Sequence, residues 1–228
     1  MLSDALRYPL AGDSWVRTIL IGGLLTILSV LVLPWFFLQG YYVRVLRGVT
    51  NDDPAPPKFD EWVDLLVDGL KLFVMNILVV VAIFVVQLVV AVLLGTGSLV
   101  TGDPSAMDPS AAGAALGALG MVVFLGAILL VSYVVPAMLA NFAREDSLAA
   151  AFDVSTVVSG ALTRDYLVAW VLAVVVGIVL GSVASVLSLL IVGIFGLFYV
   201  QIVTYYLFAR GFAAGLTDDR GDAAATAY

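Results

Sequence analysis

Long apolar runs separated by short polar segments dominate the chain. Residues 18–43, 72–95, 114–141 and 166–209 contain no charged side chain. A helix needs about 20 mostly apolar residues to cross the hydrocarbon core of a bilayer, and each run reaches that length. The runs are apolar on every side, whereas membrane β-strands alternate apolar and polar residues over about ten positions. The pattern predicts an all-α integral membrane protein with about five to six membrane-embedded helices.

The first run, 18–43, is long for one span and short for two, and Pro34 interrupts it. It forms either one kinked span or a short hairpin with arms of about 16–33 and 34–47. Basic residues near span ends favour the cytoplasmic side. The hairpin puts all ten Lys and Arg residues on that side, whereas a single span moves Arg7 and Arg17 to the other. We prefer the hairpin, which places both termini in the cytoplasm.

The later runs complete three helical hairpins. The loop 96–112 has acidic residues and no basic one, so we expect it outside the cell. The run 166–209 is long enough for two spans with a turn near 182–188. The three hairpins leave the membrane through related segments that join aromatic residues to arginine, at 41–48, 139–145 and 205–211. Duplication and convergence explain this similarity equally well.

The segment 56–71 is the most regular polar part of the chain. On a helical wheel its apolar residues share one face, namely Phe59, Trp62, Val63, Leu66 and Leu70. The opposite face carries Asp60, Asp64, Asp68 and Lys71. The pattern predicts an amphipathic helix that begins at Pro56-Pro57 and lies flat on the cytoplasmic membrane surface. A second interfacial segment is expected at 147–163, where Ser147 is a suitable N-cap.

The acidic stripe of this segment has two interpretations. The plainer one is an in-plane helix whose carboxylates are solvated. The functional one is a docking surface, in which Asp60, Asp64 and Asp68 meet a basic partner or the arginines Arg44 and Arg47. Surface helices that bind lipid usually carry Lys and Arg on the polar face, so attraction to anionic lipid does not hold this segment in place.

Composition narrows the function classes. Hydrophobic residues make up 63% of the chain, and its mean hydropathy is +1.13. The absence of Cys and His removes disulfides, thiolate and imidazole metal sites and the commonest nucleophile and general base. We therefore predict no enzyme activity, no cofactor and no metal. The net charge of −7 argues against nucleic acid as a partner and fits a high-salt setting.

Polar residues inside the runs are uncharged. The candidate intramembrane polar residues are Asn76, Gln87, Asn141 and Gln201. Ion-coupled transporters place ionisable groups at such depths, so these amides fit only a passive transporter or channel. Small residues recur at four-residue spacing at Gly113 and Gly117, and at Gly177, Gly181 and Ser185. We expect them to pack helices within the chain more than between copies.

The segment 40–48 followed by 56–71, with 6–9 and 15–18 before them, is similar to a known family. It resembles the archaeal, largely haloarchaeal, multi-span proteins classed as domain of unknown function 4013. The resemblance implies a helical membrane fold and a halophilic setting, and it transfers no activity.

These observations predict a single membrane domain at 1–215 and a disordered acidic tail at 216–228. We expect a multi-pass protein of the cell membrane that acts as a non-enzymatic scaffold, organising partners or lipid at the cytoplasmic face. The alternative is a passive transporter or channel subunit. The expected partners are the lipid bilayer and a membrane or cytoplasmic protein, and the sequence gives no oligomeric state.

Overall fold

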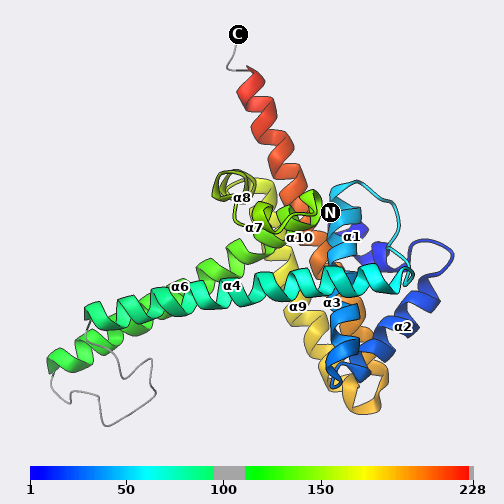
Figure 1. The fold of residues 1–228 in the computed structure, drawn as a ribbon, viewed down its shortest axis with the longest axis horizontal. Coiled ribbons are helices and arrows are strands. Elements are labelled where there is room, and N and C mark those ends of the chain that lie inside the picture. Colours follow the sequence, from blue (N-terminus) through cyan, green and yellow to red (C-terminus); the bar gives the residue numbers. More distant parts are fainter. Residues whose placement is uncertain (95–110, 226–228) are drawn as a thin grey trace. The chain divides into compact units, whose positions relative to one another are not determined.

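The fold is described from a computed structural model over residues 1–94 and 111–225. Helices and short connections account for all of this part of the chain, and no strand occurs in it (Figure 1). The elements are α1 (Leu2–Arg7), the 3₁₀ helix η1 (Tyr8–Leu10), α2 (Trp15–Leu28), α3 (Val32–Thr50), α4 (Trp62–Leu94), α6 (Ala111–Glu145), α7 (Leu148–Ala151), α8 (Val154–Ala161), α9 (Arg164–Leu187), the 3₁₀ helix η3 (Ser188–Leu190) and α10 (Val192–Ala225). The predicted all-α class is confirmed.

Four helical segments are long and apolar enough to cross a membrane. They are Trp62–Val90, Gly117–Glu145, Arg164–Leu190 and Val192–Thr217. A further candidate is the pair Leu2–Leu10 and Trp15–Leu28, which meet at an angle of 87°. The chain is therefore a membrane protein with four candidate spans, or five if the bent pair counts as one. The predicted arrangement in three membrane hairpins stays a prediction.

The structure divides into two compact units. The first comprises Met1–Phe73 and Val134–Tyr228, and the second comprises Val74–Tyr133. The helices α4 and α6 each pass from one unit into the other. The second unit consists of the apolar lengths of these two helices within the described residues, and most of its side chains are exposed, as expected for helices surrounded by lipid.

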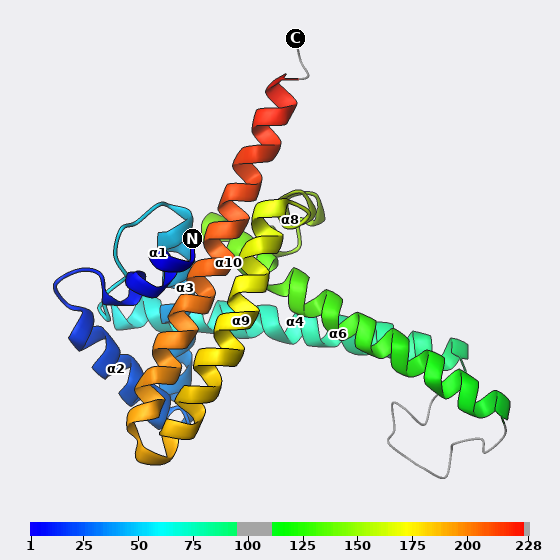
Figure 2. The same cartoon turned by 180° about the vertical axis from the view of Figure 1, so that it is seen from behind.

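The first unit is organised around α10, which packs along α9 (Figures 1 and 2). Its core cluster contains buried residues from α1, α9 and α10: Ala5, Ala173, Val176, Val200, Val203 and Leu207. The Tyr199 hydroxyl donates a hydrogen bond to the Leu6 carbonyl and so fixes α1 against α10. On α2, Gly22 and Gly23 leave room for the rings of Phe198 and Phe195, so both glycines allow α10 to pack closely against α2.

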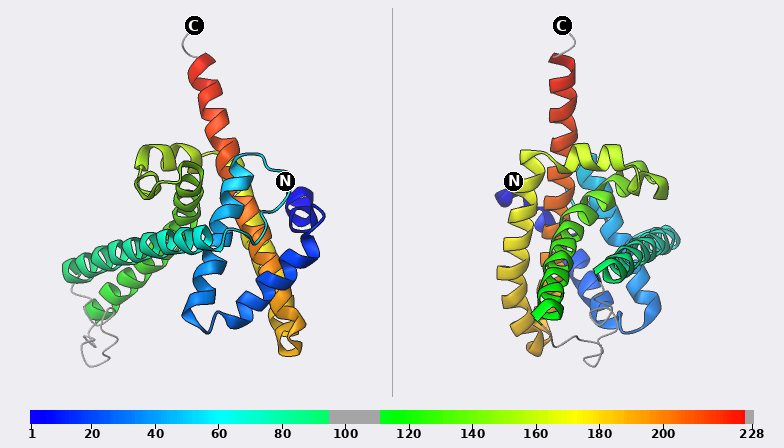
Figure 3. Two further views of the ribbon diagram at one scale, coloured as in Figure 1. Left: turned by 45° about the vertical axis from the view of Figure 1, so that its right-hand side comes forward. Right: turned by 90° about the vertical axis from the view of Figure 1, so that its left-hand side faces the viewer.

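The run 18–43 contains a break between two helices. The helix α2 ends at Leu28, and α3 begins at Val32. A tight turn joins them, in which the Leu31 amide donates to the Leu28 carbonyl. Pro34 lies in the first turn of α3, where a missing amide costs no helical hydrogen bond. Figure 3 shows α2 and α3 as the two arms of a V. The chain thus forms two helices here, and how they meet the membrane stays a prediction.

The predicted separate helix at 56–71, beginning at Pro56-Pro57, is wrong; an orientation of this segment in the membrane plane stays a prediction. Residues 53–61 are non-helical, and α4 begins at Trp62 rather than at Pro56. The helix then continues through Lys71 into the apolar run without a break. No proline interrupts this stretch, and a helix propagates once it is nucleated unless a residue stops it. The polar segment is therefore the first part of a candidate span.

Other boundaries differ in smaller ways. The turn expected near 182–188 lies at 188–191, where η3 separates α9 from α10. The helix α6 continues through Pro136. The tail expected to be disordered from residue 216 is helical as far as Ala225, because α10 continues into it and no proline stops the helix. Most of the expected external loop, from 96 to 110, lies outside the described residues.

Candidate functional site

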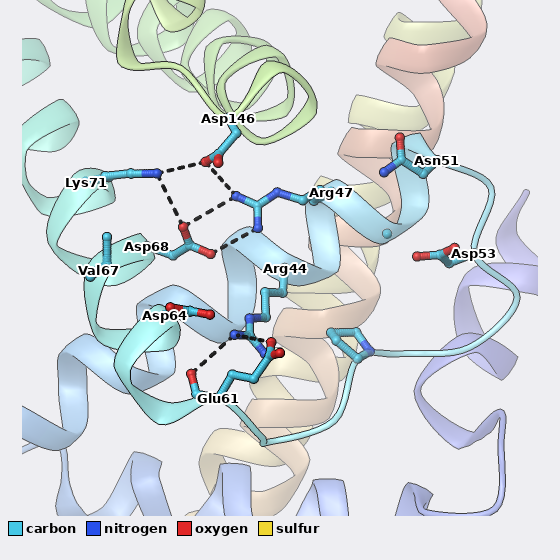
Figure 4. A pocket seen from close by; sticks show the side chains of 12 residues that line it. Arg44, Arg47, Asn51, Asp53, Glu61, Asp64, Val67, Asp68, Lys71 and Asp146 are labelled. Carbon is cyan, nitrogen blue, oxygen red and sulfur yellow. Dashed lines mark hydrogen bonds and ion pairs between the residues drawn. The ribbon is translucent and has the colours of Figure 1, made fainter.

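Charged residues from three parts of the first unit converge at one end of α3 (Figure 4). Arg44 and Arg47 lie near the C-terminal end of α3. Asp68 and Lys71 lie near the start of α4, and Asp146 directly follows α6. We call this group, with the residues that line the adjoining cavity, the charge cluster.

The connection from α3 to α4 places the first part of the cluster. Its backbone takes the left-handed conformation at Asp52 and Glu61, with φ of 62° and 49°. Phe59 is buried between these two points and stacks on Tyr41, with ring centroids 4.1 Å apart. This stacked pair holds the connection against α3, and as a result the backbone at Asp60 and Glu61 faces Arg44.

Arg44 is the first of the two arginine anchors. Its guanidinium donates to the Asp60 carboxylate and carbonyl at 3.1 Å, and to the Glu61 carboxylate and carbonyl at 3.3 Å. The Arg44 side chain is only 12% exposed, whereas the side chains of Asp60 and Glu61 are 63% and 69% exposed. The donors of Arg44 are thus engaged within the chain, and the two carboxylates keep free acceptor positions toward solvent.

Arg47 joins three segments that are distant in the sequence. Its Nε donates to the Ala143 carbonyl at 3.2 Å, in the last turn of α6. The terminal nitrogens bind both oxygens of Asp68, at 3.1 and 3.4 Å, and one oxygen of Asp146 at 2.9 Å. Carbonyls in the last turn of a helix lack an internal partner, and the helix dipole favours a cation there. Arg47 therefore ties α3 to the start of α4 and the end of α6.

Asp146 and Lys71 complete the cluster. Asp146 has a left-handed backbone, with φ of 49°, which ends α6 and turns its carboxylate toward Arg47. Lys71 Nζ donates to Asp146 at 2.9 Å and lies 3.8 Å from Asp68. The hydrogen bond from Lys71 lowers the pKa of Asp146 against the opposing effect of partial burial, and the charges of Arg47 and Lys71 also lower it.

A close helix crossing positions Asp68. A Cβ atom added at Gly40 of α3 would overlap the Leu65 carbonyl, and one added at Gly69 of α4 would overlap the Phe36 carbonyl. The two backbones therefore meet directly, which only glycine allows. Asp68 is next to this crossing and is 6% exposed, so its carboxylate lies under the guanidinium of Arg47.

A cavity of about 430 Å³ adjoins the cluster. Its charged lining consists of Arg44, Arg47, Lys71, Asp53, Glu61, Asp64, Asp68 and Asp146. Within the described residues all three cations form ion pairs, whereas Asp53 and Asp64 form none. Figure 4 shows these two carboxylates on opposite sides of the arginines. The cavity therefore presents unpaired negative charge. No group of three or more acidic residues in the described part is arranged to hold a metal ion.

The structure changes the assignment of the two faces at 56–71. Of the expected anchors only Phe59 is buried; Leu66 is half-buried, and Trp62, Val63 and Leu70 are exposed. The protein-facing side of α4 instead carries Leu65, Asp68 and Gly69. Asp60 and Asp64 are exposed as expected, but Asp68 is not solvated. Asp60 and Asp68 contact the arginines Arg44 and Arg47 within the chain, and docking of a separate partner stays a prediction.

The four candidate intramembrane amides do not share one role. Asn141 is buried at the end of α6, where it donates to the Ala150 carbonyl at 2.8 Å and accepts from Arg144. It ties α6 to α7. Gln201 of α10 hydrogen-bonds Tyr205 and lines a cavity along α9. Asn76 and Gln87 lie in the second unit, where Asn76 is exposed and Gln87 half-buried.

Sequence reasoning missed Asp146, Glu61 and the Ala143 carbonyl as members of the cluster. The acidic pair after Arg144 was a usable signal, because a carboxylate at the end of a candidate span lies near the ends of other spans on the same side. The glycine spacing gave a wrong signal. Within the described residues nothing lies within 4 Å of a Cβ added at Gly117, Gly177 or Gly181, so these glycines do not provide the expected internal packing.

Comparison with known proteins identifies a family. A family model described as a protein of unknown function (DUF4013) matches residues 23–189, which is more than half of the chain. No curated protein and no solved structure matches. The haloarchaeal setting stays a prediction.

Proposed function

Since this chain belongs to the DUF4013 family of proteins of unknown function, we propose from its own geometry that it is a membrane-embedded scaffold whose charge cluster docks a basic segment of a partner protein. The observation that carries this proposal is the excess of unpaired negative charge in the cavity. Its cations are engaged within the chain, and Asp53 and Asp64 are not.

The proposed partner contributes Lys or Arg side chains. A guanidinium or ammonium group that enters the cavity gains charge-assisted hydrogen bonds to Asp53 or Asp64. The exposed oxygens of Asp60 and Glu61 extend the same negative rim. Complementary charge of this kind mainly fixes register and speeds association. The proposal assigns no chemical step to any of these residues.

Site-specific photocrosslinking tests the docking. A photoreactive amino acid replaces Val67, an exposed residue that lines the cavity, in the full chain in native membranes. We expect a crosslinked protein that disappears in the Asp53→Asn/Asp64→Asn variant and weakens at raised salt. The matched control is Asp13→Asn, an exposed aspartate away from the cavity. A crosslink that persists after both cavity aspartates are neutralised would refute the proposal.

A second candidate function is passive transport, and one observation favours it. A cavity of about 670 Å³ runs between α9 and α10, within candidate spans. It is lined by Gly177, Gly181, Ser182, Ser185, Leu197, Val200, Gln201 and Thr204. In proteoliposomes loaded with small polar solutes, a passive pathway here predicts leakage that falls in the Gln201→Leu variant. Equal leakage from empty liposomes and from both proteins would reject it.

A further inference from the structure

The short helix α8 (Val154–Ala161) has three distinct faces. At about 100° per residue, Val157, Gly160 and Ala161 share one face, and all three are buried. A second face carries Val154, Val158 and, just after the helix, Leu162, which are 71%, 42% and 76% exposed. The third face carries Ser155, Thr156 and Ser159. An exposed apolar stripe thus lies between the buried face and a polar face.

The rotation of α8 about its axis is fixed. A Cβ atom added at Gly160 would overlap the Phe212 ring of α10, and one added at Gly215 would crowd the Gly160 carbonyl. The Asp153 side chain accepts a hydrogen bond from the Thr156 amide and caps the N-terminus. Because the glycine face is held against α10, α8 cannot turn its apolar stripe inward.

The position of α8 matches the end of the membrane-spanning part of the first unit. Only Leu162 and Thr163 separate α8 from α9, which begins the candidate span Arg164–Leu190. Figures 1 and 3 show α8 at the end of α9, lying across the direction of α9 and α10 and not along it. A helix placed across the ends of spans lies parallel to the membrane surface.

We propose that α8 is a membrane-surface helix whose stripe Val154, Val158 and Leu162 inserts into the bilayer at the boundary between headgroups and acyl chains. The occupant of this face is lipid because the stripe lies within a few residues of the lipid-exposed surface of α9, where Leu167 and Val171 are also exposed. This position of the stripe is the one that interfacial helices take when their apolar face is buried at the boundary between headgroups and acyl chains.

The polar face of α8 differs from that of most membrane-surface helices in having no basic residue. It carries Ser155, Thr156, Ser159 and the capping Asp153, and no Lys or Arg. Interfacial helices commonly add electrostatic attraction to anionic lipid through basic residues. The proposed anchoring of α8 is therefore apolar, and it does not depend on anionic lipid or on salt. This inference is independent of partner docking at the charge cluster.

Spin labelling tests the proposal, and the chain has no native cysteine to interfere. Single variants Val158→Cys, Leu162→Cys and Ser155→Cys carry a nitroxide label in nanodiscs of neutral phosphatidylcholine. Val183→Cys, in the exposed apolar surface of α9, is the lipid reference. Collision rates with oxygen report lipid, and those with a water-soluble nickel chelate report solvent.

We expect the labels at 158 and 162 to collide with oxygen and to be protected from nickel, like the label at 183. The label at 155 should show the reverse. Replacing part of the lipid with anionic phosphatidylglycerol should leave all four unchanged. Equal nickel access at 155 and 158 would overturn the proposal, since the stripe would then face water. Protection of 158 and 162 from both reagents would also overturn it, because protein would then cover the stripe.

Discussion

Replacement of Arg47 by alanine should destabilise the fold more than any other single change in the charge cluster. The substitution removes the bond to the Ala143 carbonyl, the contacts with Asp68 and the contact with Asp146. It leaves the carboxylate of the buried Asp68 with only Lys71, at 3.8 Å. An uncompensated charge of this kind is the main cost, because a buried carboxylate has lost its hydration.

The magnitude follows from the burial of the pair. Removal of one partner from a fully buried ion pair costs about 3–5 kcal/mol. Arg47 is 28% exposed and Lys71 remains nearby, so we expect a loss of about 2–3 kcal/mol in the free energy of unfolding. Arg44 lies one helical turn away and is the matched control. Its carboxylate partners are largely exposed, and Arg44→Ala should cost about 0.5–1 kcal/mol.

Reversible unfolding in mixed detergent micelles, followed by circular dichroism, measures both values. The mechanism also predicts partial rescue, since Arg47→Ala/Asp68→Asn removes the stranded charge and should be more stable than Arg47→Ala alone. Equal losses for Arg47→Ala and Arg44→Ala would refute this reasoning. A double variant no more stable than Arg47→Ala would show that the lost bond to α6, and not the stranded carboxylate, sets the cost.

Three other outcomes are expected. Gly69→Ala should force α3 and α4 apart, and like other overpacking changes it should lower the free energy of unfolding by more than about 2 kcal/mol. Gly177→Ala has open space around its Cβ and should be neutral in the same unfolding assay. Asn141→Ala should lower the free energy of unfolding by about 1–3 kcal/mol, because the Ala150 carbonyl loses its hydrogen-bond donor. It should leave solute leakage unchanged, whereas a pore-lining role for Asn141 predicts a change. The pKa of Asp146 is lowered in the folded state, so the stability that Asp146 contributes is complete above its unfolded pKa of about 3.9 and is lost as pH falls through its lower folded pKa. The free energy of unfolding, measured against pH, should therefore fall less at acid pH in Asp146→Asn.

The sequence predicted the helical class because apolar runs are a direct signal of burial in lipid. It also predicted a break in the first run from the length of the run, but it placed the break at Pro34, whereas α2 ends at Leu28 and α3 begins at Val32. It failed at 56–71 because an amphipathic pattern has the same period whether the helix lies in the membrane plane or leads into a span. The non-helical residues before Trp62 gave no warning, as Pro56-Pro57 is equally suited to a helix start.

The charge cluster was only partly predictable. The proximity of Arg44 to Asp60 follows from a short connection, since the partners are 16 positions apart in the sequence. The contact of Arg47 with Ala143 spans 96 residues, and that with Asp146 spans 99. No local pattern encodes such pairs. Gly40 and Gly69 set the rotation of α4 that buries Asp68. Their role cannot be recognised from the sequence, because it depends on the crossing of the two backbones.

The bond from Tyr199 to Leu6 has a consequence for the order of assembly during synthesis. The partners are 193 residues apart, so α1 leaves the ribosome long before the helix that buries Ala5. At the rates of about 5–20 residues per second typical of translation, α1 waits of order ten seconds or more with its apolar side uncovered. The cell's insertion machinery or the membrane surface must shelter α1 over that interval. Slowed synthesis of the stretch between residues 6 and 199 would therefore expose α1 to proteases.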